Sequence, residues 1–312
     1  ERLAQASWEK AGFPGGIPTS GTSCASLAPG ATAAQIVSAV NGCSNATTTL
    51  TAVKVVNLAA GTYNIGQIDF GDPGPTNVVL RGAGMGQTKL NITPSGVNFA
   101  INTGSYPPWF GTWTSTQGVT GGGTQNSSAV TVASATGYKA GDTCVIDMDN
   151  SGWIQGYGTG GGTTATYNSD SVGKNRDGNK AQFHLCRVTG VSGNTISFTP
   201  PLPYDLDSAR TPQISRASQR IGPVHFGIED MTVTTSGSGT HGIFLNGSYA
   251  SWIKNVELTN WGAFGFYLRW NLGMTLQGNY IHNPNTYAVD HGYGMQLDPT
   301  TNSLVTDNII YD

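Results

Sequence analysis

Four acidic and imidazole side chains gather near the C-terminal end of the sequence, at His282, Asp290, His291 and Asp298. Carboxylates and imidazoles are the side chains that most often transfer protons in catalysis, and loops that leave a rigid scaffold commonly carry them. We therefore expect these residues to form a catalytic acid/base cluster. The alternative is that they are ordinary polar residues of a turn.

Two basic residues, Lys254 and Arg269, precede this group and are candidates for contacting the substrate, because either can neutralise a carboxylate. Basic residues are otherwise scarce in this part of the chain. Residues 201–312 contain only these two together with Arg210, Arg216 and Arg220. A strongly acidic polymer is therefore the less favoured substrate.

A second group with chemical potential is aromatic, in the segment SYPPWFGTWTST at 105–116. Tyr106, Trp109 and Trp113 are close together in a polar context. Aromatic faces stack against the C–H groups of sugars, so this segment is predicted to bind a glycan. A loop that packs on the protein, or a contact between subunits, would explain the same residues.

No cofactor is expected, and calcium is the one metal that the sequence suggests. Asp147 and Asp149 alternate along an expected strand, as do Asp205 and Asp207. Carboxylates on one face can hold Ca²⁺, although solvated surface pairs are commoner.

The chain has four cysteines in two local pairs, with no CxxC spacing of the kind that binds zinc. We predict a Cys24–Cys43 bridge and a Cys144–Cys186 bridge. Disulfides persist in oxidising compartments, so the protein is expected to be secreted or at a cell surface. The alternative is four buried free thiols.

Composition excludes several classes of partner. Charged residues make up 11% of the 312 residues, and the net charge is −3. Without a Lys/Arg cluster, nucleic acid is not an expected partner. No apolar run approaches the roughly 20 residues of a membrane-spanning helix, so no membrane span is expected. The 44 glycines favour tight turns between short strands.

The elements that must position these residues repeat along the chain. Asp230, Asn255, Asn279 and Asn308 each precede an apolar-x-apolar strand, at intervals of 25, 24 and 29 residues. Gly242, Gly265 and Gly294 each open a mostly apolar segment, at intervals of 23 and 29. Two interleaved registers predict stacked coils with more than one strand per turn. The long intervals overlap in residues 282–293, where an insertion of about five residues is expected. The Asn residues at equivalent turns are expected to form a stacked side-chain ladder, in which each amide bonds to the next.

These coils, with the segments VVNLAAGTYNI (55–65) and NVVLRGAGMGQTKL (77–90), resemble the pectate-lyase-like superfamily. The resemblance covers roughly 30–120 and 213–312. It implies an all-β protein, a right-handed parallel β-helix, and activities such as polysaccharide lyase, hydrolase or epimerase. The segment YGMQLDP (293–299) is similar to a motif of mannuronan epimerases, but Thr300 stands where that motif has His.

The predicted organisation has four parts: an irregular segment (1–30), a cap with the first coils (31–127), an inserted β subdomain (128–200) and further coils (201–312). Thr32 and Gln35 form a capping box, which predicts a short helix covering the open core. The last coil has nothing after it in this sequence, which predicts either further chain or another molecule at that end.

Two functions follow. The first is a secreted protein that acts on or binds a polysaccharide. The second is a structural or adhesive protein, such as a filament subunit that self-associates through its uncapped C-terminal coil.

Overall fold

The computed structural model describes residues 10–311 except 46, 48–49, 51, 94–98, 105–112, 150–181, 219–221, 237–239 and 286–290. The chain divides into two compact units. One comprises Lys10–Tyr106 and Ile221–Asp312, and the other is built on Pro107–Arg220.

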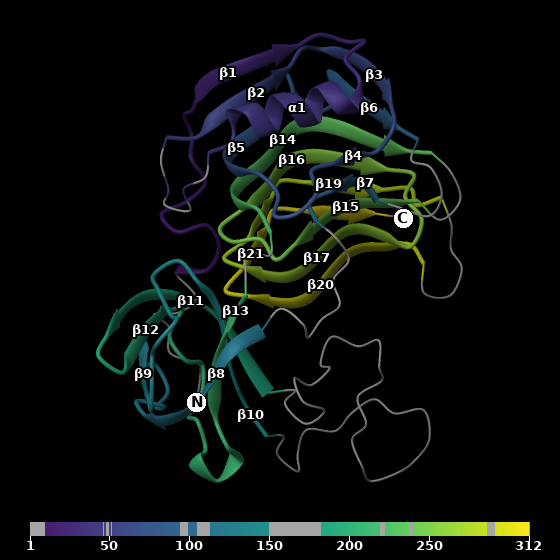
Figure 1. The fold of residues 1–312 in the computed structure, drawn as a ribbon. Helices are drawn as coiled ribbons and strands as arrows, with labels where there is room; N and C mark the ends of the chain where they lie inside the picture. Colours follow the sequence, from purple (N-terminus) through teal and green to yellow (C-terminus); the bar gives the residue numbers. More distant parts are fainter. Residues whose placement is uncertain are drawn as a thin grey trace, which may run out of the picture. The chain divides into compact units, whose positions relative to one another are not determined.

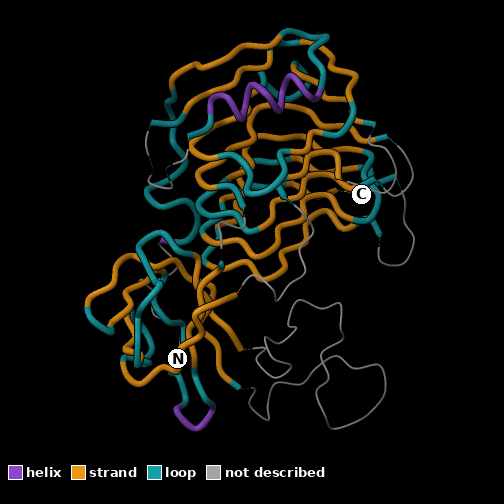
Figure 2. The backbone as a smooth tube through the Cα atoms, viewed as in Figure 1, coloured by secondary structure: helices purple, strands orange, loops and turns teal. Residues whose placement is uncertain are grey.

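Parallel strands make up the first unit (Figures 1 and 2). Its eleven-stranded sheet contains β1 (Thr22–Leu27), β2 (Lys54–Leu58), β3 (Gly61–Ile65), β5 (Thr76–Arg81), β6 (Thr88–Ile92), β14 (Val224–Thr235), β16 (Trp252–Thr259), β18 (Thr275–Gln277), β19 (Tyr280–His282), β21 (Leu304–Thr306) and β22 (Ile309–Tyr311). Its five-stranded sheet contains β4 (Ile68–Asp69), β7 (Phe99–Asn102), β15 (His241–Asn246), β17 (Phe264–Leu272) and β20 (Tyr293–Thr301).

Each coil bends within the eleven-stranded sheet at a residue with positive φ. Asp230, Asn255 and Asp307 have φ of 56°, 56° and 57°, and Gly278 has 66°. Asp and Asn tolerate this left-handed conformation, and Gly adopts it without steric cost. The bend divides β14 and β16 into two segments that pair with different strands. A full coil therefore has three strand segments around an apolar interior, which is a parallel β-helix.

The repeated glycines occupy equivalent positions on neighbouring coils, as predicted. A Cβ on Gly242 would lie 2.3 Å from the carbonyl oxygen of Gly265, and one on Gly265 would lie 2.3 Å from that of Gly294. Only glycine permits this approach. The second repeat register is therefore confirmed.

The predicted ladder of Asn residues exists as two separate ladders. Asn255 Nδ2 donates to Asp230 Oδ1 at 2.7 Å on the exposed bend. Asn279 Nδ2 donates to Asn308 Oδ1 at 2.8 Å. Because Tyr280 pairs with Glu257, Asn279 aligns with Val256 and not with Asn255. The prediction of a single ladder was wrong, because Asn255 lies at the bend of its coil whereas Asn279 lies one residue after the bend of the next coil, which is at Gly278.

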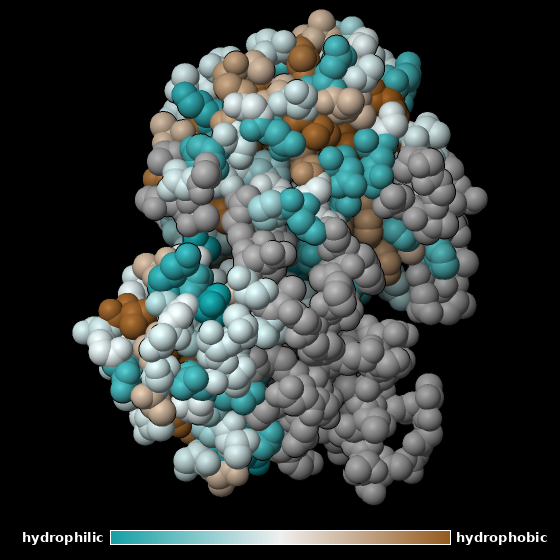
Figure 3. Space-filling model, viewed as in Figure 1, coloured by the Kyte–Doolittle hydropathy of each residue, from teal (hydrophilic) through white to brown (hydrophobic). Residues whose placement is uncertain are grey.

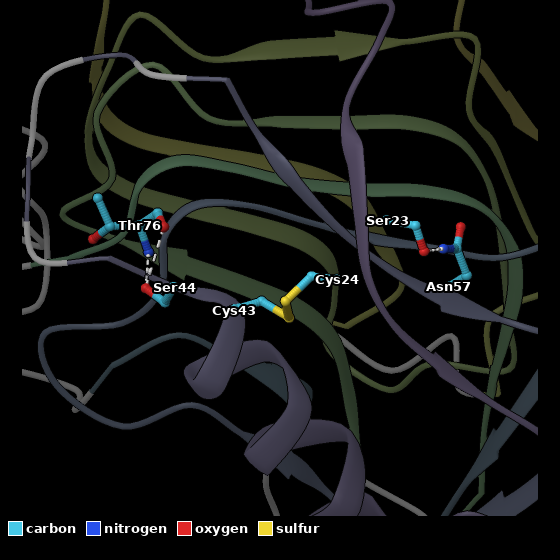
Figure 4. The surroundings of a disulfide bond; sticks show 6 residues. All are labelled: Ser23, Cys24, Cys43, Ser44, Asn57 and Thr76. Carbon is cyan, nitrogen blue, oxygen red and sulfur yellow. Dashed lines mark hydrogen bonds between the residues drawn. A yellow bond between two sulfur atoms is a disulfide. The ribbon is translucent and has the colours of Figure 1, made fainter.

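A short helix, α1 (Ala33–Cys43), lies across the first coils (Figure 2). Gln35 N donates to Thr32 Oγ1 at 3.2 Å, and Thr32 N donates to Gln35 Oε1 at 2.8 Å, which confirms the capping box. Ile36 and Val40 are fully buried in the core. The predicted Cys24–Cys43 disulfide ties the end of α1 to β1 (Figure 4).

The N-terminal segment, 1–30, was predicted to be irregular, but part of it forms a strand. Thr22–Leu27 forms β1, which pairs in parallel with β2. Phe13 is 4% exposed, and its backbone N–H donates to Thr275 Oγ1 at 2.8 Å. Gly12 N donates to the carbonyl of Asn302 at 2.8 Å. Residues 12–27 thus contact both late and early coils.

The second unit is a closed antiparallel barrel. Its strands follow the order β10 (Thr143–Met148), β11 (Gln182–Ser192), β12 (Thr195–Thr199), β9 (Ala129–Val132), β8 (Trp113–Gly121) and β13 (Gln213–Ala217). The hairpin predicted around Gly193 joins β11 to β12. Cys144 and Cys186 face each other on β10 and β11 and form the second predicted disulfide. The barrel includes more of the sequence than the predicted insertion, 128–200, because β8 before that range and β13 after it complete the barrel.

The surface of the protein carries both polar and apolar side chains. On the face drawn in Figure 3, hydrophilic residues are interspersed with small hydrophobic patches. Apolar side chains of the last coil are exposed, at Leu297, Leu304, Val305, Ile309, Ile310 and Tyr311. In the described part of the chain, no helix has the length and apolar character needed to cross a membrane.

Candidate functional site

Side chains on the outer face of the five-stranded sheet form three rows that cross the strands. The first row is aromatic. It contains Phe99, His241, Phe264 and Tyr293, one from each of β7, β15, β17 and β20. Neighbouring ring centroids lie 4.8, 5.1 and 6.0 Å apart along the row. Parallel pairing without a shift in register places equivalent residues side by side, so these rings form a continuous row of ring contacts, in which Phe264 and Tyr293 are stacked.

The second row adds further rings and ends in an amide. Phe244, Tyr267 and Gln296 pair in register on β15, β17 and β20. Phe244 stacks on Phe99 at 4.5 Å, and Tyr267 stacks on Phe264 at 4.7 Å. The first two rows therefore form one aromatic cluster.

The third row is polar and charged. Asn246, Arg269 and Asp298 pair in register on the same strands. Asp298 Oδ2 accepts a hydrogen bond from the Tyr267 hydroxyl at 2.6 Å. Gln296 Nε2 donates to the same carboxylate at 3.1 Å. Hydrogen bonds to a charged carboxylate are strong and directional, so Asp298 is held in a defined orientation.

Access to the three rows increases toward β20. Phe99, Phe244 and Tyr267 are buried, and Arg269 is only 2% exposed. Tyr293, in contrast, is 44% exposed, and His291 just before it is also exposed. Gln296 and Asp298 are half-buried. A ligand would therefore reach this surface at β20, where an exposed ring rests on buried ones.

His241 is the titratable member of the aromatic row. Burial, with a smaller contribution from the nearby His291, lowers the pKa of His241 to about 4. Its ring is therefore neutral near pH 7. Its buried Nδ1 has no hydrogen-bond partner among the described residues. A neutral imidazole with a vacant nitrogen can accept or donate a hydrogen bond to a ligand or a water molecule.

The structure brings some of the predicted residues together and separates others. Arg269 and Asp298 are neighbours in the third row, and His291 lies near His241. His282 lies instead on the eleven-stranded sheet, where its Nε2 is 3.0 Å from Glu257 Oε1.

The remaining predicted residues lie away from the three rows or outside the described part of the chain. Lys254 is half-buried on the eleven-stranded sheet, paired in register with Gln277. Trp113 begins β8 of the barrel. Asp290, Tyr106 and Trp109 fall outside the described residues.

Sequence reasoning missed the aromatic row and the partners of Asp298, although the signal was present in the glycine repeat. The residue before each repeated glycine is His241, Phe264 or Tyr293. The second residue after it is Phe244, Tyr267 or Gln296, and the fourth is Asn246, Arg269 or Asp298. Each offset corresponds to one row, so following three offsets from one glycine would have located the site.

The acidic pairs considered for calcium have protein partners. Asp205 accepts from the backbone N–H of Gln125 at 2.7 Å, and Asp207 caps Ser208–Arg210 through the N–H of Ala209 at 2.9 Å. Thr211 donates its hydroxyl to Asp149. Within the described ranges, no group of three or more His, Cys, Asp or Glu side chains is arranged to hold a metal ion.

Comparison with known proteins gives one family match. Residues 225–312 match the family model described as a right handed beta helix region. No curated protein sequence matches the chain.

Three solved structures resemble this chain at low sequence identity. The tailspike gp49 of Pseudomonas phage LKA1 is 17% identical with a TM-score of 0.46; 72% of this chain and 32% of that one are covered. The tailspike gp61 of Pseudomonas phage phi297 is 12% identical with a TM-score of 0.48; 81% of this chain and 37% of that one are covered. The Gp54 tailspike of Acinetobacter baumannii bacteriophage AP22, in complex with A. baumannii capsular saccharide, is 14% identical with a TM-score of 0.37; 83% of this chain and 41% of that one are covered. The chain thus spans less than half of each of these proteins.

Proposed function

We propose that this right-handed parallel β-helix protein binds a polysaccharide on the outer face of its five-stranded sheet. The observation that carries the proposal is the continuous aromatic row, exposed at Tyr293, beside the polar row that ends in Asp298. Sugars present C–H faces that stack on aromatic rings and hydroxyls that need directional hydrogen-bond partners. On β20, Tyr293 supplies the stacking contact, and Gln296 and Asp298 beside it supply the hydrogen-bond partners.

Pre-organisation supports the same function. Tyr293 stacks on Phe264 with an interplanar angle of 12°, and Phe264 in turn stacks on the buried Tyr267. Asp298 is held by Tyr267 and Gln296. Groups that are already ordered lose little conformational entropy when a ligand binds, so more of the contact energy contributes to affinity.

Asp298 is the residue best suited to acid/base chemistry if the bound polymer is also cleaved. Its carboxylate is accessible, oriented, and on the same strand as the exposed Tyr293. His291 and Asp290 precede that strand and are its expected partners in proton transfer. Arg269 is too buried to contact a polymer directly, so we assign it a supporting role behind Asp298. The two disulfides favour an extracellular or surface location.

The test is binding and turnover on a panel of neutral and uronate polysaccharides, with calcium or a chelator. Tyr293→Ala should weaken binding roughly tenfold or more, the effect of losing one stacking contact. Tyr293→Phe, which keeps the ring, and Val191→Ala, an exposed apolar position on the barrel, are the controls. Equal binding by the wild-type protein and Tyr293→Ala would refute the proposal.

The same panel tests for catalysis. New reducing ends alone would indicate a hydrolase, and unsaturated products would indicate a lyase. Asp298→Asn should abolish either product while binding persists. A protein that binds the polymer but yields no product from it is a binding protein.

The second candidate function is structural. The exposed apolar side chains of β20, β21 and β22 are the observation that favours self-association through strand edges. Sedimentation velocity and negative-stain images test it. Concentration-dependent growth into fibres would favour the structural function, whereas isolated monomers at all concentrations would oppose it.

A further inference from the structure

Another face of the β-helix carries a second set of ordered rows. On β3, β6, β14, β16 and β19, alternate residues point into the core, at Tyr63, Leu90, Val233, Leu258 and Ile281. The residues between them therefore lie on the outer face of the eleven-stranded sheet. This face is separate from the five-stranded sheet that holds Asp298.

The first row on this face consists of hydrogen-bonding side chains from five successive strands. It contains Asn64, Asn91, Thr234, Thr259 and His282. Asn91 Nδ2 donates to Asn64 Oδ1 at 2.9 Å, and the hydroxyls of Thr234 and Thr259 are 3.0 Å apart. These bonds fix the side chains yet use only part of their capacity. Both asparagines are exposed, so their remaining donors and acceptors face solvent.

A parallel row contains the charged residues of the same face. It consists of Lys89, Thr232, Glu257 and Tyr280. Glu257 accepts from the Thr232 hydroxyl at 2.6 Å and contacts His282 at 3.0 Å. Burial would raise the pKa of Glu257, but the hydrogen bonds from Thr232 and His282 outweigh it, so that pKa lies below its usual value. Glu257 is therefore charged at neutral pH, and the positive charge of Lys89 lies nearby.

The two rows continue onto β22 at Ile309 and Tyr311, and on β19 they form a stacking surface. The rings of Tyr280 and His282 are 3.9 Å apart and inclined by only 20°. Both side chains are half-buried, which fixes the rings yet leaves them accessible from outside.

From these contacts we propose that the outer face of β3, β6, β14, β16 and β19 is a second saccharide-binding surface, for a neutral polysaccharide laid across the strands. Neighbouring strands are about 4.8 Å apart, so the hydroxyls and amides recur at close to the length of one pyranose unit. Each sugar would meet one Asn or Thr of the first row, and Tyr280 with His282 would stack on one ring. A neutral polymer fits because the carboxylate of Glu257 already accepts the Thr232 hydroxyl and lies near the positive charge of Lys89.

Gel retardation by hydroxyethyl cellulose, galactomannan and dextran, each a neutral polymer, tests the proposal. Thr259→Lys and Asn91→Lys place a long charged side chain on the first row without touching the core. Thr22→Lys, at an exposed position of β1, is the matched control. Circular dichroism and thermal unfolding establish that each variant folds, and Asn91→Lys, at an exposed site, serves if Thr259→Lys does not fold.

The proposal requires that at least one neutral polymer retards the wild-type protein. Both row variants should then bind it roughly tenfold more weakly, whereas Thr22→Lys should bind normally. The proposal is overturned if no neutral polymer binds, or if both folded row variants bind as the wild type does. Tyr293→Ala separates the two surfaces: loss of binding in that variant alone would support the site at Asp298 and reject this one.

Discussion

The β-helix and the barrel are both built from short strands, but the contacts of a residue follow from a repeat in the β-helix and not in the barrel. In the β-helix, each position recurs on the next coil, so glycine lies against glycine and asparagine bonds to asparagine. In the barrel, antiparallel strands close on themselves and nothing repeats. There, the Tyr138 hydroxyl donates to the carbonyls of Ser115 and Ile214, and no repeat interval relates this contact to another.

Because positions recur only in the β-helix, a functional surface can be predicted from a sequence repeat only in that unit. In the β-helix, three fixed offsets from one glycine generate three rows and hence a surface. In the barrel, every buried polar group must be located individually. The family model matches only residues 225–312, which lie wholly within the unit that repeats.

The largest effect is expected for Gly265→Val. The new Cβ would lie 2.3 Å from the backbone oxygen of Gly294, and neither coil can move without disturbing its neighbours. Backbone overlap of this kind should cost about 4 kcal/mol or more and lower hydrogen-exchange protection throughout the β-helix. Gly190→Ala in the barrel is the control, since a Cβ there meets no atom within 4 Å. A stable Gly265→Val variant would contradict the glycine ladder.

Removal of each disulfide compares the two units directly. The bridge in the β-helix spans 19 residues, and the bridge in the barrel spans 42. The entropy of closing these loops predicts losses of about 3 kcal/mol for Cys24→Ser with Cys43→Ser and about 4 kcal/mol for Cys144→Ser with Cys186→Ser. Denaturant unfolding under non-reducing conditions measures both. The reverse order would show that packing of α1 against the core matters more than loop length.

Lowering the pH should reduce the stability of the barrel because of His184. Burial lowers the pKa of His184 to about 4 from its ordinary 6.5, although its hydrogen bond to the carbonyl of Pro200 acts in the opposite direction. The unfolded state therefore binds more protons between these pH values, and stability falls as pH drops from 6.5 toward 4. The loss is about 3 kcal/mol at most. Below pH 4 both states are protonated and the loss stops growing.

His184→Gln isolates this effect, because its amide can still donate to Pro200 and never ionises. Hydrogen exchange of barrel peptides, measured from pH 7 to pH 4, should depend less on pH in this variant than in the wild type. The β-helix peptides of the same sample are the internal control. An unchanged pH profile in the barrel would show that His184 does not carry the acid sensitivity.

Most of the β-helix could be predicted from sequence, because stacking converts a one-dimensional interval into a contact. The glycine register, the capping box of α1 and both disulfides follow from local spacing alone. The prediction of the Asn ladder failed because 24 residues, the interval from Asn255 to Asn279, was taken for one full coil. Tyr280 pairs with Glu257, which makes the true interval 23, as it is between Gly242 and Gly265.

The site was predicted only in part. Arg269 and Asp298 were chosen for their charge, and the register does bring them together. The closeness of His282 to Asp290 in the sequence predicts that the two lie together, but the chain passes from one sheet to another between β19 and β20. The extent of the barrel also escaped prediction. Its closure depends on β8 and β13, which are far apart in sequence, and no local pattern indicates such a pairing.

The smallest effects should separate the inner and outer ladders of the β-helix. Asn279 is 1% exposed; its Oδ1 accepts from the backbone N–H of Val256, and its Nδ2 donates to the carbonyl of Ile253. Asn279→Ala leaves both buried backbone groups unpaired and should cost about 2 kcal/mol. Asn255→Gly removes an exposed side-chain bond and keeps the positive φ of 56°, so its cost should stay within about 0.5 kcal/mol. Urea unfolding of the two variants measures the difference. Equal costs would mean that burial does not distinguish the two ladders.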